Sequence, residues 1–370
     1  MPDRMSRLRR DLMDLMLVPG LSGHETRVRQ AIRARLPDGV SGTTDRLGNL
    51  IVTFPGTGPS VMLFTHMDQL GFFVRRIEDN GLIRVERMGG VPERALAAQP
   101  VMLCPPGRED VPGLITNKSH HATTPDEKYV VVKTPDLTID TGHDSKAAVE
   151  ATGIAIGTPV VYRPQATELG PHRIAGTSVD DRAGCAVLLE IIRALTDRKA
   201  HDKNSPTVHV VFSVQEEFNL RGAVVAAQTL TPDIALQIDL MTPSDTPDLS
   251  DRAEMALGAG PGISLYSFHG RGTLNGVIPH PALVQLFEDT ASAESLTLQR
   301  SAQVGVLTDL SYVQLVGAGV ASLDIGFPMR YSHSANELCD LRDLDGLTHL
   351  ILAALDRITP DFSLNRDDYP

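Results

Sequence analysis

The chain has 370 residues, a formal net charge of -12 at pH 7 and an apolar fraction of 42%. This length allows one large domain or two ordinary ones, and the apolar fraction is that of a soluble globular protein. The acidic balance, without a block of Lys or Arg, argues against nucleic acid or an anionic membrane surface as the main partner.

Neither a membrane span nor a secretory signal is expected. No apolar stretch approaches the length that crosses a bilayer, and no secretory signal opens the chain. The cysteines Cys104, Cys185 and Cys339 are isolated and odd in number, which is not the pattern of a disulfide framework. These observations predict a cytoplasmic protein with buried free thiols.

Two helices and two strands are predicted at the start of the chain. Leu and Met recur at helical spacing over residues 3–17, which predicts an amphipathic helix. Ser22 and Glu25 have the spacing of a capping box, which predicts a second helix that runs to about Leu36. Strands are predicted next, at residues 49–54 and 61–65.

The residue pattern of the chain changes after Asp68. Residues 71–171 alternate short β-like runs with Gly, Pro and Asn-Gly turns, apart from one short helix near residues 145–151. The dipeptide Asn80-Gly81 lies between two such runs and predicts a β-hairpin, because it accepts positive φ. We therefore predict an all-β insert at 71–171.

From Asp181 onward, helix-like and strand-like runs alternate, which is typical of an α/β fold. The predicted helices are 183–195 and 220–228, and the predicted strands are 207–214, 234–239 and 321–327. The predicted fold class is therefore α/β, with a catalytic domain formed by residues 1–70 and 172–370 and interrupted by the insert.

Metal-binding side chains follow several of these strands. They are His66 and Asp68 after 61–65, Glu216 and Glu217 after 208–214, Asp239 after 234–238, and His333 beyond 321–327, with Asp180-Asp181 just before a helix. Ligands of open α/β sheets bind outside the carboxyl ends of the strands, so we expect these side chains to converge. Two His with several carboxylates suit zinc, cobalt or manganese.

Each signal alone has an ordinary structural alternative. His-x-Asp fits a hydrogen-bonded structural histidine, Asp180-Asp181 fits a helix N-cap, and adjacent Glu residues are common on surface turns. A glycosidase also uses two carboxyls, but it leaves the histidines and the other aspartates unexplained. Together the residues can bind two cations about 3.5–4 Å apart, and such a pair of cations can hold a water nucleophile between them.

The residue pairs have different predicted tasks in such a site. His66 would bind metal while Asp68, on the same strand face, accepts its second ring proton or fixes its orientation through a neighbour. One carboxylate of Asp180-Asp181 would bridge the cations and the other would brace the turn or orient His66. One of Glu216 and Glu217 would ligate, and the other would take the proton of the attacking water.

Short segments spread nearly end to end carry a family resemblance. They are Ser22-Gly23-His24-Glu25, residues 65–72, Gly113-Leu114-Ile115 with His120-His121, residues 139–142, residues 179–184, Gln215-Glu216-Glu217, Gly260-Pro261, Thr308-Asp309 and residues 330–334. Through them the chain resembles the di-metal aminopeptidases of metallopeptidase family forty-two. This family includes the tetrahedral (TET) aminopeptidases and glutamyl aminopeptidase, and was formerly also labelled endoglucanase. The resemblance implies a mixed-sheet α/β/α metallopeptidase-like catalytic domain.

The resemblance also implies a role for each residue of the site. The metal ligands would be His66, Asp180, Glu217, Asp239 and His333, with Asp180 bridging and joined to Asp181 by a cis peptide. Glu216 would be the general base and Asp68 would orient His66. The enzyme would release N-terminal residues from short peptides through a metal-activated water, with one or two divalent ions. The insert would mediate homo-oligomerisation, into a dimer or a dodecamer.

The chain departs from the family pattern near the substrate pocket. Gln69 stands where the family usually has Glu, Val306-Leu307-Thr308-Asp309-Leu310 replaces Gly-Gly-Thr-Asp-Ala/Gly, and Ala335 replaces Pro. We assign Gln69, Leu307, Thr308, Asp309 and Arg330 to this pocket, and we expect the changes to alter its charge and narrow it. Two alternatives therefore stay open, namely hydrolysis of a small non-peptide amide or amine on the same metals, and a non-catalytic homologue.

The remaining histidines are not assigned to the site. His269 and His280 flank the glycine-rich residues 270–273, which are predicted to be a loop. His120-His121 lies in the insert, either at the surface or within reach of a neighbouring subunit. The chain has no Walker loop and no dinucleotide fingerprint, so a nucleotide cofactor has no support.

Overall fold

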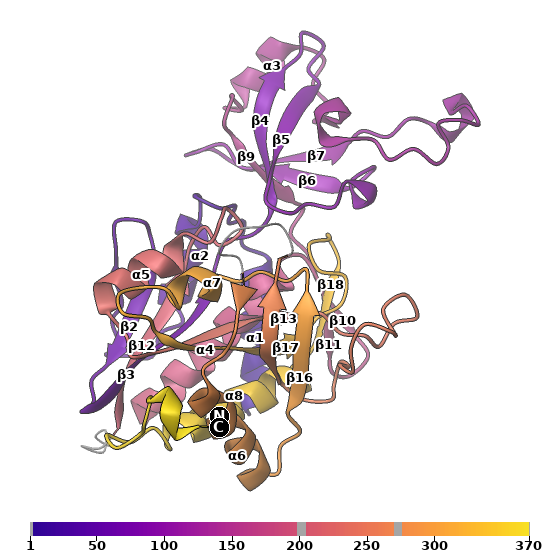
Figure 1. Cartoon of the computed structure of the whole chain (residues 1–370). Helices are drawn as coiled ribbons and strands as arrows, with labels where there is room; N and C mark the ends of the chain where they lie inside the picture. Colours follow the sequence, from indigo (N-terminus) through magenta and orange to yellow (C-terminus); the bar gives the residue numbers. More distant parts are fainter. Residues whose placement is uncertain (1–2, 198–204, 270–275, 370) are drawn as a thin grey trace.

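The computed structural model describes residues 3–197, 205–269 and 276–369. These residues form an α/β unit with a separate small β barrel above it in the view of Figure 1. Within these ranges no helix has both the length and the apolarity to cross a membrane. The predicted loop at 270–273 lies outside the described ranges.

Eight α-helices are present in the described ranges. They are α1 (Arg4–Met16), α2 (Thr26–Arg33), α3 (Lys146–Ala151), α4 (Val179–Asp197), α5 (Gly222–Leu230), α6 (Pro281–Ala293), α7 (Leu310–Val313) and α8 (Leu341–Leu355). The predicted helices at 3–17 and 183–195 are confirmed as α1 and as most of α4.

A mixed sheet of nine strands forms the centre of the α/β unit. Its order is β1-β2-β12-β3-β13-β17-β14-β15, and β16 also pairs with β14. The strands are β1 (Thr43–Thr44), β2 (Leu50–Phe54), β3 (Gly58–His66), β12 (Pro206–Ser213), β13 (Ile234–Met241), β14 (Gly262–Phe268), β15 (Gly276–Val277), β16 (Gln299–Val304) and β17 (Ala321–Pro328). A smaller sheet contains β10 (Ala166–Leu169), β11 (Arg173–Gly176) and β18 (Glu337–Asp340).

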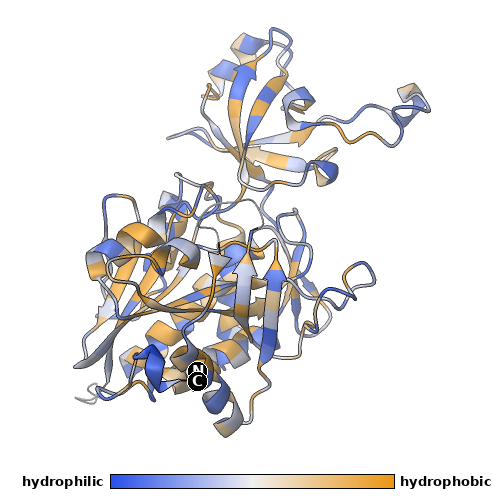
Figure 2. Cartoon of the chain, viewed as in Figure 1, coloured by the Kyte–Doolittle hydropathy of each residue, from blue (hydrophilic) through white to orange (hydrophobic). Residues whose placement is uncertain are grey.

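Helices cover both faces of the large sheet, because its central strands are apolar on both faces. On β3, Val61 and Leu63 join the core cluster that contains residues of α1, α4 and α8. Met62 and Phe64, which alternate with them, join a second cluster with residues of α5 and α7. Figure 2 shows apolar residues along these strands. The arrangement is the α/β/α layering that the sequence predicts.

The topology brings the carboxyl ends of four strands to one edge. Strands β12, β3, β13 and β17 are neighbours, and each adjacent pair is parallel. The segments that follow these strands therefore meet, as expected for an open α/β sheet.

The insert is a closed barrel of six strands with its own core. Its strands are β4 (Gly71–Ile77), β5 (Ile83–Met88), β6 (Pro100–Leu103), β7 (Val111–Ile115), β8 (Thr138–Asp140) and β9 (Pro159–Tyr162). The predicted hairpin is confirmed, since β4 and β5 pair antiparallel and Gly81 has a φ of 85°. A long arm between β7 and β8 projects from the barrel and exposes 87% of Tyr129 (Figure 1).

The predicted capping box is wrong. Helix α2 begins at Thr26, and its N-cap Glu25 makes no side-chain capping bond. The Ser22 hydroxyl donates instead to the buried carboxylate of Asp68, at 2.5 Å. The hydrogen bond from Ser22 to a charged carboxylate is stronger than the bond that Ser22 would accept from a backbone N–H as a helix cap. The tertiary contact therefore overrides the local motif. Helix α2 is also shorter than predicted and ends at Arg33.

Candidate metal centre

Residues from five segments converge at the carboxyl edge of the sheet. His66 ends β3, Asp239 lies in β13, and the other residues follow β12, begin α4 or follow β17. Among the described residues, two groups have ligand atoms within 4.8 Å of one another, namely His66, Asp181 and Asp239, and Asp180, Glu217 and His333. The structure thus brings together all five side chains that the sequence predicts as ligands.

Asp180 extends between the two groups. Its Oδ1 lies 2.9 Å from Nε2 of His66, and its Oδ2 lies 3.6 Å from Nε2 of His333. One carboxylate therefore points each of its oxygens at a different histidine. The peptide bond from Asp180 to Asp181 is cis.

Asp181 is held by the chain itself. The Thr65 hydroxyl donates to its Oδ2, and the backbone N–H of Gly184 donates to its Oδ1 at 2.8 Å. With both oxygens engaged by β3 and α4, this carboxylate braces the turn. Of the two adjacent aspartates, Asp180 is the one available to bridge two cations.

Carbonyl oxygens near both histidines favour the same tautomer. Nδ1 of His66 lies 3.2 Å from the Asp68 carbonyl oxygen, and Nδ1 of His333 lies 3.1 Å from the Gly90 carbonyl oxygen. A proton on Nδ1 leaves Nε2 free as the ligand atom. Gly90 follows β5, so the insert supplies this acceptor. A Cβ at Gly90 would lie only 2.8 Å from Nδ1 of His333, which requires glycine there.

The buried carboxylate of Asp68 supports the turn after β12. Its carboxylate accepts hydrogen bonds from the Ser22 hydroxyl and from the backbone N–H groups of Glu216, at 3.0 Å, and Glu217, at 3.1 Å. Burial alone would raise the pKa of Asp68, but His66 and these donors lower it. An ionised Asp68 therefore fixes the turn that carries both glutamates.

The other carboxyls of the site lack compensating charge. Burial, followed by repulsion from neighbouring carboxylates, raises the pKa of Glu216 and Glu217 well above its usual range, although His66 opposes the shift. The same causes raise the pKa of Asp239 to about 7. The site thus favours added positive charge, and its His and carboxylate donors fit divalent ions.

Two residues that support the ligands were missed by the sequence analysis. Gln237 on β13 donates to Oδ2 of Asp239 at 3.0 Å. Glu337 accepts hydrogen bonds from the backbone N–H groups of His333, at 2.7 Å, and Asp180, at 3.1 Å. A polar residue at a buried position of an apolar strand could have indicated Gln237, whereas no spacing indicates Glu337.

Replacing Glu337 with glutamine should weaken metal binding about 10- to 100-fold. Glutamine keeps one acceptor oxygen but turns an N–H₂ group toward the second backbone N–H, so one ligand segment loses its support. Competition with a chromophoric chelator measures the affinity. Asp343→Asn is the matched control, because Asp343 also accepts from two backbone N–H groups, those of Gly258 and Gly260, away from the site. Equal affinities of the Glu337→Gln and control proteins would contradict the supporting role.

A cavity of about 1230 Å³ of empty space, partly open to solvent, lies over the candidate ligands. Leu307 and Thr308 line it, as does His269, to which the sequence analysis assigned no role. Three other residues predicted for the pocket have partners elsewhere. Gln69 accepts from the Gly20 N–H, Asp309 accepts from Ser213, and Arg330 pairs with Asp245. A contribution of these three residues to substrate binding stays a prediction.

Known proteins match the chain over most of its length. The family description M42 glutamyl aminopeptidase matches residues 48–350. The lysyl aminopeptidase of Pyrococcus furiosus is 30% identical over 349 residues, which cover 93% of this chain and 96% of the relative. The solved aminopeptidase APDkam598 of Desulfurococcus kamchatkensis is 30% identical, with a TM-score of 0.89 and coverage of 98% of both chains. The TET1 peptidase of Pyrococcus horikoshii, described as assembling into a tetrahedron or an octahedral shell, is 27% identical, with a TM-score of 0.82 and coverage of 94% and 98%.

Proposed function

The chain belongs to the M42 glutamyl aminopeptidase family, and on this premise we propose that it is a metal-dependent aminopeptidase that releases N-terminal residues from short peptides. The observation that carries the proposal is the position of Asp180, whose two oxygens face the ligand atoms of His66 and His333. This is the arrangement that two neighbouring cations require of a shared ligand.

The proposed ligands are His66, Asp180, Glu217, Asp239 and His333, and the proposed ions are zinc, cobalt or manganese. When bound, such ions polarise a carbonyl oxygen and lower the pKa of a water molecule. Glu216 lines the same cavity, takes the proton from the attacking water and gives it to the leaving amine. The acidic lining of the cavity also favours the free ammonium group of a peptide N-terminus.

We propose further that the protein is a homo-oligomer and that the insert contributes to its interface. The exposed apolar residues of the arm between β7 and β8, among them Tyr129 and Val130, support this proposal. The assembly described for TET1 supports it as well. A cytoplasmic location is supported by the three free cysteines, Cys104, Cys185 and Cys339.

Product analysis by mass spectrometry tests the activity. The protein is reconstituted separately with zinc, cobalt and manganese, and incubated with free peptides, their N-acetylated counterparts, small amides and aromatic amines. We expect single residues to be released from free N-termini only, because an acetyl group removes the charge that the acidic cavity binds. Hydrolysis of a small amide with inert peptides would contradict the peptidase assignment, and an inert protein with all three metals would favour a non-catalytic homologue.

A further inference from the structure

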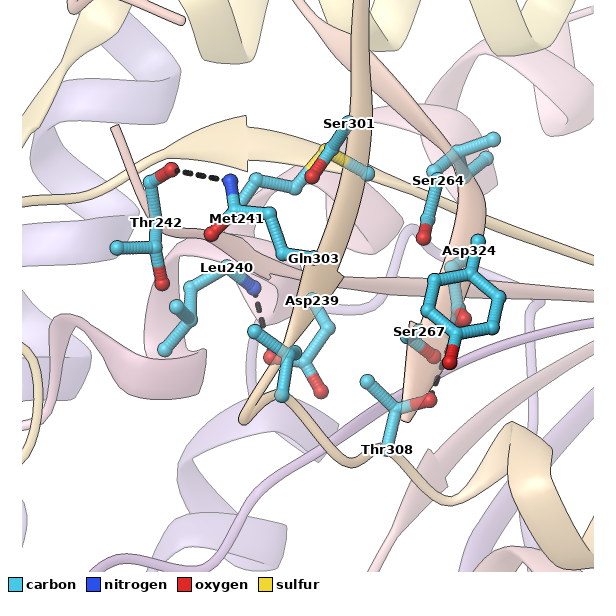
Figure 3. A pocket seen from close by; sticks show the side chains of 13 residues that line it. Asp239, Leu240, Met241, Thr242, Ser264, Ser267, Ser301, Gln303, Thr308 and Asp324 are labelled. Carbon is cyan, nitrogen blue, oxygen red and sulfur yellow. Dashed lines mark hydrogen bonds between the residues drawn. The ribbon is translucent and has the colours of Figure 1, made fainter. Parts of the chain in front are cut away.

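A second, smaller cavity adjoins the cavity over the candidate ligands. The two cavities share Asp239, Leu240, Thr242, Val306 and Thr308 in their linings. The second cavity comprises about 360 Å³ of empty space, part of which is open to solvent. Its lining joins Asp239, a candidate metal ligand, to side chains of neighbouring strands such as Ser264, Ser301 and Asp324 (Figure 3).

The lining of the second cavity is rich in hydroxyl groups, and none of its members in the described part of the chain is Lys, Arg or His. Strands β14, β16 and β17 supply most of the polar side chains, which are Ser264, Tyr266, Ser267, Ser301, Gln303 and Asp324. Strand β16 has an unusual pattern, because its buried positions Gln299, Ser301 and Gln303 are all polar. A strand that buries polar residues is informative, because buried polar groups need hydrogen-bond partners.

Asp324 lines this cavity, and one of its two carboxylate oxygens accepts no hydrogen bond. The carboxyl is 3% exposed, and its Oδ1 accepts from the Thr308 hydroxyl at 3.0 Å. Its Oδ2 is buried without a hydrogen-bond partner, and so is the hydroxyl oxygen of Ser267 in the same lining. Buried polar atoms in native proteins are normally paired, so these two atoms leave hydrogen-bonding capacity in the cavity that a polar ligand can use.

We propose that the second cavity binds the side chain of the substrate's N-terminal residue, and that Asp324 selects the cationic side chains of lysine and arginine. This inference rests on the proposed aminopeptidase function and specifies its substrate class. A carboxylate among hydroxyl groups attracts an ammonium or guanidinium group and repels the carboxylate of an acidic residue. Arg252, which contacts the lining residue Gln303, also donates to the Val304 carbonyl.

The sheet register places Asp324 at a suitable depth. Gln237 on β13 pairs with Asp324 on β17, and Asp239 pairs with Gly326. Asp324 therefore lies one strand across and two residues below the ligand Asp239, which separates their Cα atoms by about 8 Å. A long side chain that starts near the ligands can reach this depth, whereas a short one cannot.

Matched substrates that differ only in charge test the selection. We would measure kcat/KM of the metal-loaded enzyme on fluorogenic amides of lysine, arginine, norleucine, leucine and glutamate, because norleucine keeps the aliphatic chain of lysine without its charge. Lysine should exceed norleucine by about 100-fold, and glutamate should be the poorest substrate. Asp324→Asn should lower the rate on lysine about 100-fold and change the rate on norleucine less than about threefold.

Asparagine keeps the oxygen that accepts from Thr308, so the fold of the cavity is preserved in this variant. Asp343→Asn, a change of another buried carboxyl outside the cavity, is the control and should leave the lysine-to-norleucine ratio unchanged. A ratio near one in the wild type, or a parallel loss on all substrates in Asp324→Asn, would overturn the inference. If no amide is cleaved with any metal, the proposed function itself fails, whereas cleavage of leucine without preference for lysine contradicts only the role of Asp324.

Discussion

Replacing Glu216 with glutamine is expected to lower kcat about 10³-fold while the bound metal stays at the wild-type level. The amide of glutamine cannot take a proton from water at neutral pH, and no other carboxyl occupies the same position. The backbone N–H of Glu216 is held by Asp68, so the substitution leaves the turn in place. Steady-state kinetics combined with metal analysis by mass spectrometry measures both quantities on one sample.

The neighbouring glutamate provides a matched control. Glu217 follows Glu216 directly, has the same chemistry, and lies with Asp180 and His333 in one candidate ligand group. Glu217→Gln should therefore lose metal first and activity as a consequence, whereas Glu216→Gln should lose activity alone. Near-full turnover by a metal-loaded Glu216→Gln enzyme would rule out its role as general base.

Removing metal by chelation should abolish activity and lower the melting temperature, by more at about pH 8.5 than at about pH 6. Burial and neighbouring carboxylates raise the pKa of Asp239 to about 7 and that of Asp309 to about 8 in the metal-free fold. In the unfolded chain the pKa of both carboxyls is near 4. Their contribution to stability is full below about pH 4 and is lost as pH rises through about 7 to 8.

Between about pH 4 and its folded-state pKa, each carboxyl removes about 1.4 kcal/mol of stability per pH unit, so the loss ends near pH 7 for Asp239 and near pH 8 for Asp309. A bound metal at 1,000 times its dissociation constant adds about 4 kcal/mol and offsets this loss. Differential scanning calorimetry of chelated and reconstituted protein at the two pH values measures the difference. Asp239→Asn removes one of the titrating groups and should flatten the pH dependence of the chelated protein. An equal effect of chelation at both pH values would contradict this account.

The layered fold and the edge of the sheet where the candidate ligands meet could be predicted from the sequence, because both follow from local patterns. Apolar runs such as 61–65 and 234–238 are buried strands, and polar residues that follow parallel strands meet at one edge. The hairpin at Asn80-Gly81 is equally local, since the turn dipeptide and the register of its strands depend on adjacent residues.

Features that depend on partners distant in the chain could not be predicted. Residue types and spacing left open which of Asp180 and Asp181 bridges, and only the family resemblance assigned Asp180, because the choice depends on Thr65 occupying an oxygen of Asp181. The capping box failed for the same reason, since Asp68 lies 46 residues from Ser22. The polar cavity around Asp324 was also missed, because its lining comes from four strands and two loops.

The Gly90 carbonyl of the β barrel lies within hydrogen-bond distance of His333, a candidate metal ligand of the catalytic unit. Because the barrel has a largely separate hydrophobic core, it could be considered for removal or for replacement by another domain. Excision would nevertheless delete the carbonyl that favours the ring tautomer of a candidate ligand, and a transplanted barrel would have to restore a glycine carbonyl at the same place. A minimal enzyme derived from this chain must therefore retain the loop after β5, even if it is designed to remain a monomer.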